Sequence, residues 1–154
     1  MTMARTGPST TGTARGSALT TAAKIVALIF LGVGILGFIP GITTNFGDMT
    51  FAGHHSDAHL LGIFKVSVLH NLVHLAFGIA GLALARSMAG AKAFLIGGGV
   101  IYLLLWLYGL IIDKDSAANF VPLNTADDWL HFLLGVGMIA LGTVLSRRPS
   151  PSTA

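Results

Sequence analysis

Four long runs of residues without Asp, Glu, Lys or Arg constrain the fold of this chain more than any other feature of its sequence. They cover Ile25–Ile42, Val66–Ala85, Ala93–Ile112 and Trp129–Ser146, and each is 18 or 20 residues long. A helix rises about 1.5 Å per residue, so such runs reach roughly 27–30 Å, the thickness of the hydrocarbon core of a bilayer. The runs therefore predict an all-α fold, an integral membrane bundle of four transmembrane helices.

The composition argues against a soluble domain. Charged residues make up 10% of the chain, hydrophobic residues make up 53%, and the mean hydropathy is +0.79, whereas about 25% charge is typical of globular proteins. The helices of a soluble bundle would also carry a polar stripe with a period of 3.6 residues, and none of the four runs does. A cleaved signal peptide is the alternative for the first run, but no small-residue cleavage site follows Pro40.

The charges outside the runs are sorted by side. Seven of the nine cations share one side with no acid: Arg5, Arg15, Lys24, Arg86, Lys92, Arg147 and Arg148. The opposite side holds Lys65 and Lys114 with all six acids: Asp48, Asp57, Asp113, Asp115, Asp127 and Asp128. By the positive-inside rule the cationic side is cytoplasmic. This predicts a multi-pass protein of the plasma membrane, with up-down-up-down helices and both termini in the cytoplasm.

The basic pI does not predict a nucleic-acid partner, because the cations flank the membrane and do not form one binding face. The chain divides into three parts. Residues 1–21, rich in Thr, Ser, Ala and Gly, predict a disordered cytoplasmic tail. Residues 22–147 form the four-helix membrane domain, and residues 148–154 form a short cytoplasmic tail.

The six histidines all fall in the outer half of this predicted topology. His54, His55 and His59 lie in the segment between the first two runs, whereas three others lie inside the runs: His70, His74 and His131. His70 and His74 are spaced i, i+4 and therefore share a face. Small residues, which mark close helix contacts in membranes, follow the histidines on two faces: His74, Gly78, Gly81 and Ala85 on one run, and His131, Gly135, Met138 and Gly142 on another. We therefore expect the histidines to point into the bundle.

An inward-facing ionisable residue in a membrane is a candidate functional site. Two imidazoles at i, i+4 can share one metal ion, so His70, His74 and His131 predict a transition-metal site, with water or Asp128 in the fourth position. Haem would instead use one histidine from each of two helices, His74 and His131. The other interpretations are a structural role, in which the histidines hydrogen-bond to neighbouring helices or headgroup water, and proton handling.

The segment between the last two runs is dense in turn-forming residues. Thr125 followed by Asp128 predicts a capping box at the start of the last helix. Trp129 is placed as an interfacial anchor. Tyr102 and Trp106 lie four residues apart on the third run and are interpreted as packing residues.

Two motifs carry a resemblance to a known family: Leu69-His70-Asn71-Leu72-Val73-His74 and Asp115-Ser116-Ala117-Ala118-Asn119-Phe120-Val121-Pro122-Leu123-Asn124. With them the chain resembles, over about residues 22–147, an actinobacterial family of four-helix membrane proteins catalogued as a domain of unknown function (family 4383). The resemblance implies a four-helix fold and a bacterial plasma membrane. It supplies no activity and no catalytic residue.

The functional expectation is a non-enzymatic membrane protein, an accessory subunit or scaffold that contacts lipid and a membrane-protein partner or a second copy of itself. No nucleophile elbow, phosphate loop or HExxH motif is present in the sequence. The alternative is a membrane protein that binds a metal or haem through the histidines. A small transporter or proton-handling protein is the third choice, because apart from the histidines and Asn71 no strongly polar side chain lies in the middle of the runs to mark a pathway.

Overall fold

Within residues 10–147, which the computed structural model describes, with side chains from Gly16 onward, the chain forms four α-helices. They are α1 (Thr10–Leu36), α2 (Val68–Leu84), α3 (Met88–Ile111) and α4 (Thr125–Ser146). Three of the described helices contain stretches long and apolar enough to cross a membrane: Gly16–Leu36, Met88–Ile111 and Thr125–Ser146. The helix α2, with 17 residues, is shorter.

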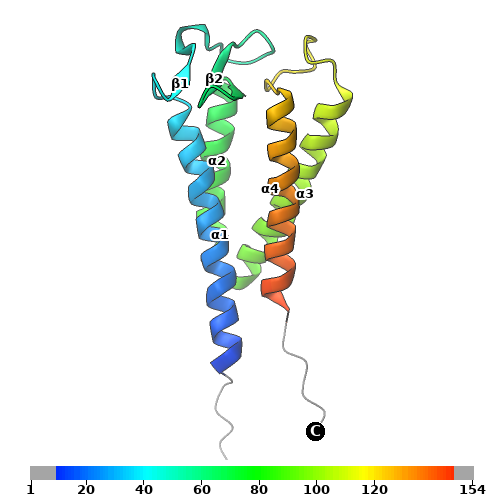
Figure 1. Cartoon of the computed structure of the whole chain (residues 1–154). Coiled ribbons are helices and arrows are strands. Elements are labelled where there is room, and N and C mark those ends of the chain that lie inside the picture. The colour runs from blue at the N-terminus through cyan, green and yellow to red at the C-terminus, as the bar shows by residue number, and fades with distance from the viewer. Residues whose placement is uncertain (1–9, 148–154) are drawn as a thin grey trace, which may run out of the picture.

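Successive helices run in opposite directions and form two pairs, α1 with α2 and α3 with α4 (Figure 1). The connection between α1 and α2 and the connection between α3 and α4 lie together at one end of the bundle. We call this end the loop end. The start of α1, the end of α4 and the short turn between α2 and α3 lie at the opposite end.

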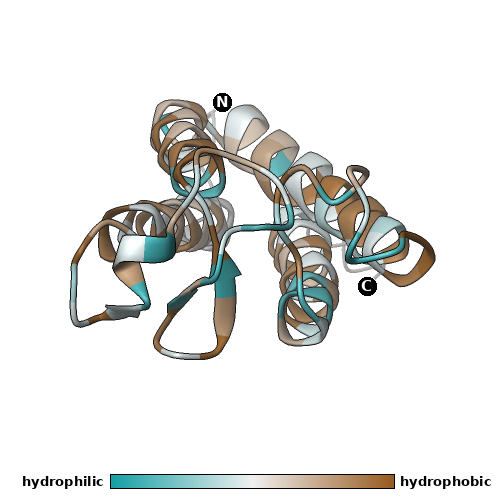
Figure 2. Cartoon of the chain, turned by 90° about the horizontal axis from the view of Figure 1, so that it is seen from above, coloured by the Kyte–Doolittle hydropathy of each residue, from teal (hydrophilic) through white to brown (hydrophobic). Residues whose placement is uncertain are grey.

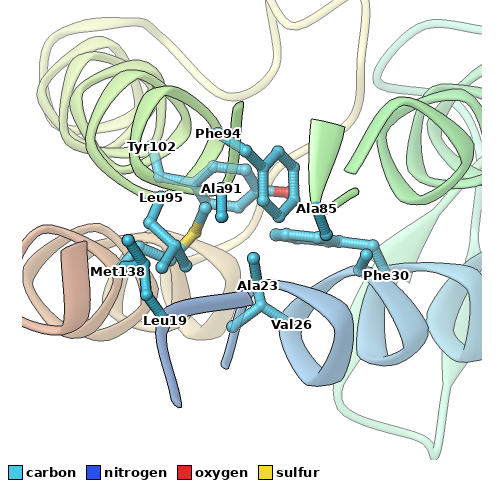
Figure 3. Close-up of a cluster of buried hydrophobic side chains, with 11 residues drawn as sticks. Leu19, Ala23, Val26, Phe30, Ala85, Ala91, Phe94, Leu95, Tyr102 and Met138 are labelled. Atoms are coloured by element: carbon cyan, nitrogen blue, oxygen red, sulfur yellow. The ribbon is translucent and has the colours of Figure 1, made fainter. Parts of the chain in front are cut away.

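The pairs meet along an apolar core of side chains from α1, α3 and α4 (Figure 3). Phe30 of α1 is central to it, with ring centroids 5.2 Å from Tyr102, 5.1 Å from Phe77 and 6.4 Å from Phe94. The other members of the core are small or aliphatic, including Leu19, Ala23, Leu95 and Met138. Aromatic rings thus fill the centre, and small side chains let the helix backbones approach.

The loop end carries a small antiparallel sheet that the sequence did not predict. Its strands, in the order β1 (Thr43–Thr44), β2 (Ala58–Leu60) and β3 (Phe64–Val66), follow each other as in the chain, with a short 3-10 helix η1 (Phe46–Asp48) after β1. In β2 the side chains of Ala58 and Leu60 are buried while His59 between them is partly exposed. That alternation is the period of a strand with one face on a core.

The N-terminal helix is longer than predicted. The helix α1 begins at Thr10, so residues 10–21 of the predicted disordered tail are helical. Residues 1–9 and the predicted tail 148–154 lie outside the described residues.

At its other end, α1 stops at Leu36, before the predicted limit at Ile42. The Thr43 hydroxyl lies 3.2 Å from the carbonyl oxygens of both Leu36 and Gly37. The hydroxyl is a hydrogen-bond donor for backbone carbonyl groups that the end of a helix leaves without partners. Pro40, which cannot donate a backbone hydrogen bond, prevents the helix from continuing.

The start of α2 lies later than predicted, at Val68 and not at Val66, because β3 occupies the preceding residues. Ser67 caps the helix, and its side chain accepts a hydrogen bond from the backbone N–H of His70 at 3.1 Å. The helix α2 is therefore shorter than predicted at its N-terminal end. The cap at Ser67 fixes the first turn of α2, which carries His70.

The start of α4 is set by a capping box one residue earlier than predicted. The side chain of Asn124 accepts from the backbone N–H of Asp127 at 2.9 Å, and the Asp127 carboxylate accepts from the backbone N–H of Asn124 at 2.9 Å. Thr125 and Asp128 do not form the predicted box. The predicted capping box is therefore present, but it is formed by Asn124 and Asp127, one residue earlier than predicted.

The outward sides of the helices are apolar, and hydrophobic colours dominate the helices in Figure 2. Large exposed side chains include Leu28 on α1, Ile79 on α2, Leu104 on α3 and Leu133 on α4. A soluble protein rarely exposes contiguous apolar surface on this scale. Together with the three long apolar helices, this surface identifies the chain as a membrane protein.

Candidate functional site

The polar residues inside the helices gather at the loop end of the bundle. In α2 the buried residues are His70, Asn71, His74, Gly78 and Gly81. In α4 they are Asp127, Asp128, His131, Gly135, Met138 and Gly142. The predicted inward faces of both helices are therefore confirmed.

His70 and His74 are held by hydrogen bonds on their Nδ1 sides. His74 Nδ1 lies 3.0 Å from the carbonyl oxygen of His70, and since a carbonyl only accepts, this nitrogen carries the proton. His70 Nδ1 lies 3.4 Å from Asn71 Oδ1, and the His70 and His74 ring centroids are 4.2 Å apart. With Nδ1 donating, a neutral His74 has an unprotonated Nε2, which accepts from the Tyr102 hydroxyl at 3.4 Å.

His131 completes the cluster from α4. Its ring meets the ring of Tyr102 edge-on, with centroids 5.1 Å apart and an interplanar angle of 84°. The residue is 5% exposed, and its Nδ1 is buried without a hydrogen-bond partner. The other such side-chain atom among the described residues is Nε1 of Trp106, whose ring packs on Phe132. Nδ1 of His131 is thus a fully buried ring nitrogen without a hydrogen-bond partner.

Two cavities adjoin these histidines, and both are lined by His70, His74 and His131. The aromatic cavity, about 130 Å³, lies between α2 and α3 and includes Phe77, Tyr102, Tyr108 and Phe120 in its walls. The aliphatic cavity, about 160 Å³, lies between α1 and α4 and includes Ile29, Val33, Leu60 and Leu134. The histidines therefore stand between two apolar spaces.

Hydrogen bonds join the two helix pairs at the loop end. The carboxylate of Asp127 accepts from the backbone N–H of Lys65 in β3 at 3.1 Å, in addition to its role in the capping box. The Asn124 side chain donates to the carbonyl oxygen of Ile63 at 2.8 Å. These contacts tie the hairpin of β2 and β3 to the first turn of α4, so one acidic residue caps a helix and joins the two halves.

Asp128, the predicted fourth metal ligand, has a different partner. Both of its carboxylate oxygens bind Lys114 Nζ, at 2.9 and 2.7 Å, and its side chain is 4% exposed. It is not among the residues that line either cavity. Within the part of the chain that the structure describes, no group of three or more His, Cys, Asp or Glu side chains has an arrangement suited to a metal ion. The predicted four-residue metal site is thus not assembled.

The remaining histidines, His54, His55 and His59, belong to the connection between α1 and α2. The rings of His54 and His55 are in tilted contact, with centroids 3.8 Å apart, and the His54 carbonyl oxygen accepts from Lys65 Nζ at 2.7 Å. His59 Nδ1 bonds to the carbonyl oxygen of Asp57 at 2.9 Å. None of the three lines the cavities.

Sequence reasoning missed the parts that Tyr102, Lys114 and Asn119 play at the site. Asn119 is buried in the connection between α3 and α4, where its side chain bonds to the carbonyl oxygens of Lys114 and Leu123 and to the backbone N–H of Leu123. It thereby shapes the loop that carries cavity residues Phe120 and Leu123. The available signal was the run Asn119–Asn124, in which short polar residues flank a proline.

Taken together, the fold and this site define a helical membrane protein with a histidine cluster between two helix pairs. The chain belongs to the family described as Domain of unknown function (DUF4383), whose model matches residues 20–144. This confirms the family resemblance inferred from the two motifs. No curated protein and no solved structure matches the chain.

Proposed function

We propose that the chain crosses the plasma membrane four times, with an up-down-up-down arrangement and both termini in the cytoplasm. The helix α1 ends at the loop end, while α3 begins at the opposite end (Figure 1). The chain must therefore return between Leu36 and Met88, and α2 is the helix that returns it. Seventeen residues reach about 26 Å. This length is a few Å short of a typical core, a mismatch that local thinning of the bilayer accommodates.

The charges of the described residues support the orientation. Arg86 lies in the turn between α2 and α3, Lys92 lies near the start of α3, and Lys24 lies midway along α1, whereas all six acids lie in the two long connections or in the first turn of α4. The loop end therefore faces away from the cytoplasm under the positive-inside rule. The histidine cluster would then lie near the outer interface of the membrane.

Within the membrane, we propose that the protein is a non-enzymatic accessory subunit or scaffold. The observation that carries this proposal is that most polar groups of the site have structural partners. The His74 ring bonds to its own helix and to Tyr102, Asp127 caps α4, and Asp128 pairs with Lys114. The contact of His74 with Tyr102 joins α2 to α3, and Asp127 also accepts from Lys65. These groups therefore hold the two helix pairs together, while the pair of Lys114 and Asp128 fixes the connection between α3 and α4.

A scaffold of this kind contacts a second membrane protein or another copy of itself through its outward helix sides. We expect a photo-crosslinking residue, p-benzoylphenylalanine, placed singly at Ile79, Leu104 or Leu133 to give a protein adduct of defined mass at one or more positions in native membranes. These three side chains are exposed on α2, α3 and α4, so together they sample different sides of the bundle.

The matched control is the same substitution at Phe51, which is exposed in the outer connection and does not lie on a helix. Mass spectrometry of the adducts distinguishes a self-adduct from a foreign partner. Lipid adducts alone at all three helix positions would contradict the accessory or scaffold role.

A further inference from the structure

The hairpin of β2 and β3 exposes large apolar side chains at its turn. Leu61 is 61% exposed and Ile63 is 53% exposed, and no Asp, Glu, Lys or Arg occurs between Asp57 and Lys65. We propose that this turn is inserted among the lipids of the bilayer at the loop end, as an interfacial element beside the helices. This placement rests on the proposed four-span arrangement and adds to it a lipid contact made by one of the connections.

The hairpin lies beside the ends of two apolar helices. Leu61 and Phe64 line the aliphatic cavity, and so do Val33 of α1 and Leu130 of α4. Leu130 follows the first residue of α4 by five positions, roughly 8 Å of helix rise, and comes directly after Trp129, the predicted interfacial anchor. Seen from above, the turn of the hairpin projects sideways past the helices (Figure 2). It therefore continues the apolar outer surface of α1 and α4 at the level of the membrane interface.

The backbone of the turn meets the requirement of an apolar surrounding. Lipid chains offer no hydrogen bonds, so backbone groups that face them need partners within the protein. The three N–H groups of the turn all donate to carbonyl oxygens: Leu61 to Ile42 at 2.9 Å, Gly62 to His59 at 3.1 Å, and Ile63 to Leu60 at 3.1 Å. The turn can therefore enter lipid without leaving these donors unpaired.

The open edge of the sheet is covered as well. The strand β3 is at one edge, and an edge strand ordinarily presents unpaired N–H and C=O groups. Here the start of α4 supplies partners. The carbonyl oxygen of Ile63 accepts from the Asn124 side chain, and the backbone N–H of Lys65 donates to the Asp127 carboxylate.

Polarity changes along the hairpin from its base to its turn. His59 and Lys65 are opposite each other in the pairing of β2 with β3, and both bond to groups away from the turn. Lys65 Nζ donates to the carbonyl oxygen of His54, and His59 Nδ1 donates to that of Asp57. A polar base with an apolar tip is the distribution expected of an element that lies in the interface, because its polar part stays among headgroups and water.

The turn also contains a residue that its backbone does not favour. Leu61 has a φ of 55°, in the left-handed region, where glycine and asparagine are preferred. Side chains held in such a conformation often have a function that offsets the strain. A large apolar side chain at this position gains stability from contact with lipid, whereas in water it would gain none.

The test is spin labelling of single-cysteine variants of the full chain in liposomes of palmitoyl-oleoyl phosphatidylcholine, since the chain has no cysteine. Collisions of the nitroxide label with oxygen, which concentrates in lipid, are compared with collisions with a water-soluble nickel chelate present on both sides. Leu133→Cys, on the outward side of α4, is the lipid reference. Gly47→Cys, exposed in the same connection as the hairpin, is the aqueous reference. We expect the ratio of oxygen to chelate collisions at Ile63→Cys to be shifted from the Gly47→Cys value to that of Leu133→Cys.

Ile63→Cys is the decisive variant because Ile63 lines neither cavity, and Leu61→Cys takes its place if that variant does not fold. A ratio equal to that of Gly47→Cys would overturn the insertion of the turn and leave the four-span arrangement intact. Low accessibility to both reagents would also overturn it, because that result shows that protein covers the turn. An aqueous label at Leu133→Cys would contradict the four-span arrangement itself, and the insertion with it.

Discussion

Replacing Lys114 with methionine is expected to lower the free energy of unfolding by about 3 kcal/mol, the lower end of the cost of breaking a buried ion pair. The Lys114 ammonium contacts both oxygens of Asp128, whose side chain is 4% exposed, while the Lys114 side chain is 31% exposed. Methionine keeps the length and the apolar stem of the lysine. It removes the charge and leaves a buried carboxylate without its cation.

The double variant Lys114→Met/Asp128→Asn distinguishes the loss of the ion pair from the cost of leaving the Asp128 carboxylate unpaired. Removing the second charge should recover part of the loss, because the penalty in the single variant comes mainly from the carboxylate left unpaired. Lys92→Met, at an exposed position on α3, is the control and should change stability by less than about 0.5 kcal/mol. Reversible unfolding in mixed detergent and SDS measures all four proteins. Equal stability of Lys114→Met and Lys92→Met would show that the ion pair does not hold the loop end.

Gly81→Leu is expected to be similarly disruptive, because α2 has no room for a side chain at this position. A Cβ at Gly81 would lie 2.5 Å from Cζ of Phe94 and 2.7 Å from Cβ of Ala27. Overpacking a close contact costs about 1–3 kcal/mol and occasionally more, and three further heavy atoms follow the Cβ of leucine. We expect a loss of about 3 kcal/mol or a failure of the two helix pairs to associate. Gly78→Leu should behave alike, since its Cβ would lie 2.8 Å from the Ala27 carbonyl oxygen.

Gly97→Leu and Gly137→Leu are the matched controls. Beyond the surrounding backbone of their own helices, no heavy atom lies within 4 Å of a Cβ added at either glycine, and leucine favours helix more than glycine does. These two variants should therefore keep or slightly raise stability. If Gly81→Leu were as stable as these controls, α1, α2 and α3 would not be in close contact at Gly81. The scaffold proposal would then lose its structural basis.

Much of the helical part of the fold could be predicted from the sequence, because lipid imposes simple requirements on a chain. The charge-free runs contain most of α2, α3 and α4, and the small residues that follow His74 and His131 mark the buried faces of two helices. Close backbone approach needs small residues at a spacing of three or four, so this signal is local in sequence.

The loop end could not be predicted in the same way. The strands β2 and β3 have three residues each, too few to give a clear alternation in the sequence. Their pairing depends on the turn at Leu61 and Gly62, both with positive φ, and on contacts with the start of α4. The apolar residue Val66 therefore looked like the start of the second membrane run, and α2 was expected to be longer than it is.

The histidines of the site were predictable, but their partners were not. An i, i+4 pair and a third histidine at similar depth identified the residues that line both cavities. The choice of Asp128 as a fourth ligand stays a prediction; the sequence did not show that Lys114, fourteen positions away, binds its carboxylate. The lack of a partner for His131 Nδ1 is likewise set by tertiary packing.

The central claim is that four helices cross the membrane and place both long connections on its outer side. The most direct measurement is labelling of single cysteines in intact cells with a membrane-impermeant thiol reagent, since the chain has no cysteine of its own. Gly47→Cys, Ala118→Cys and Ala89→Cys are suitable because all three positions are exposed. We predict labelling at Gly47 and Ala118 in intact cells and at Ala89 only after permeabilisation. Labelling at Ala89 in intact cells, or at only one of the other two positions, would contradict the four-span arrangement.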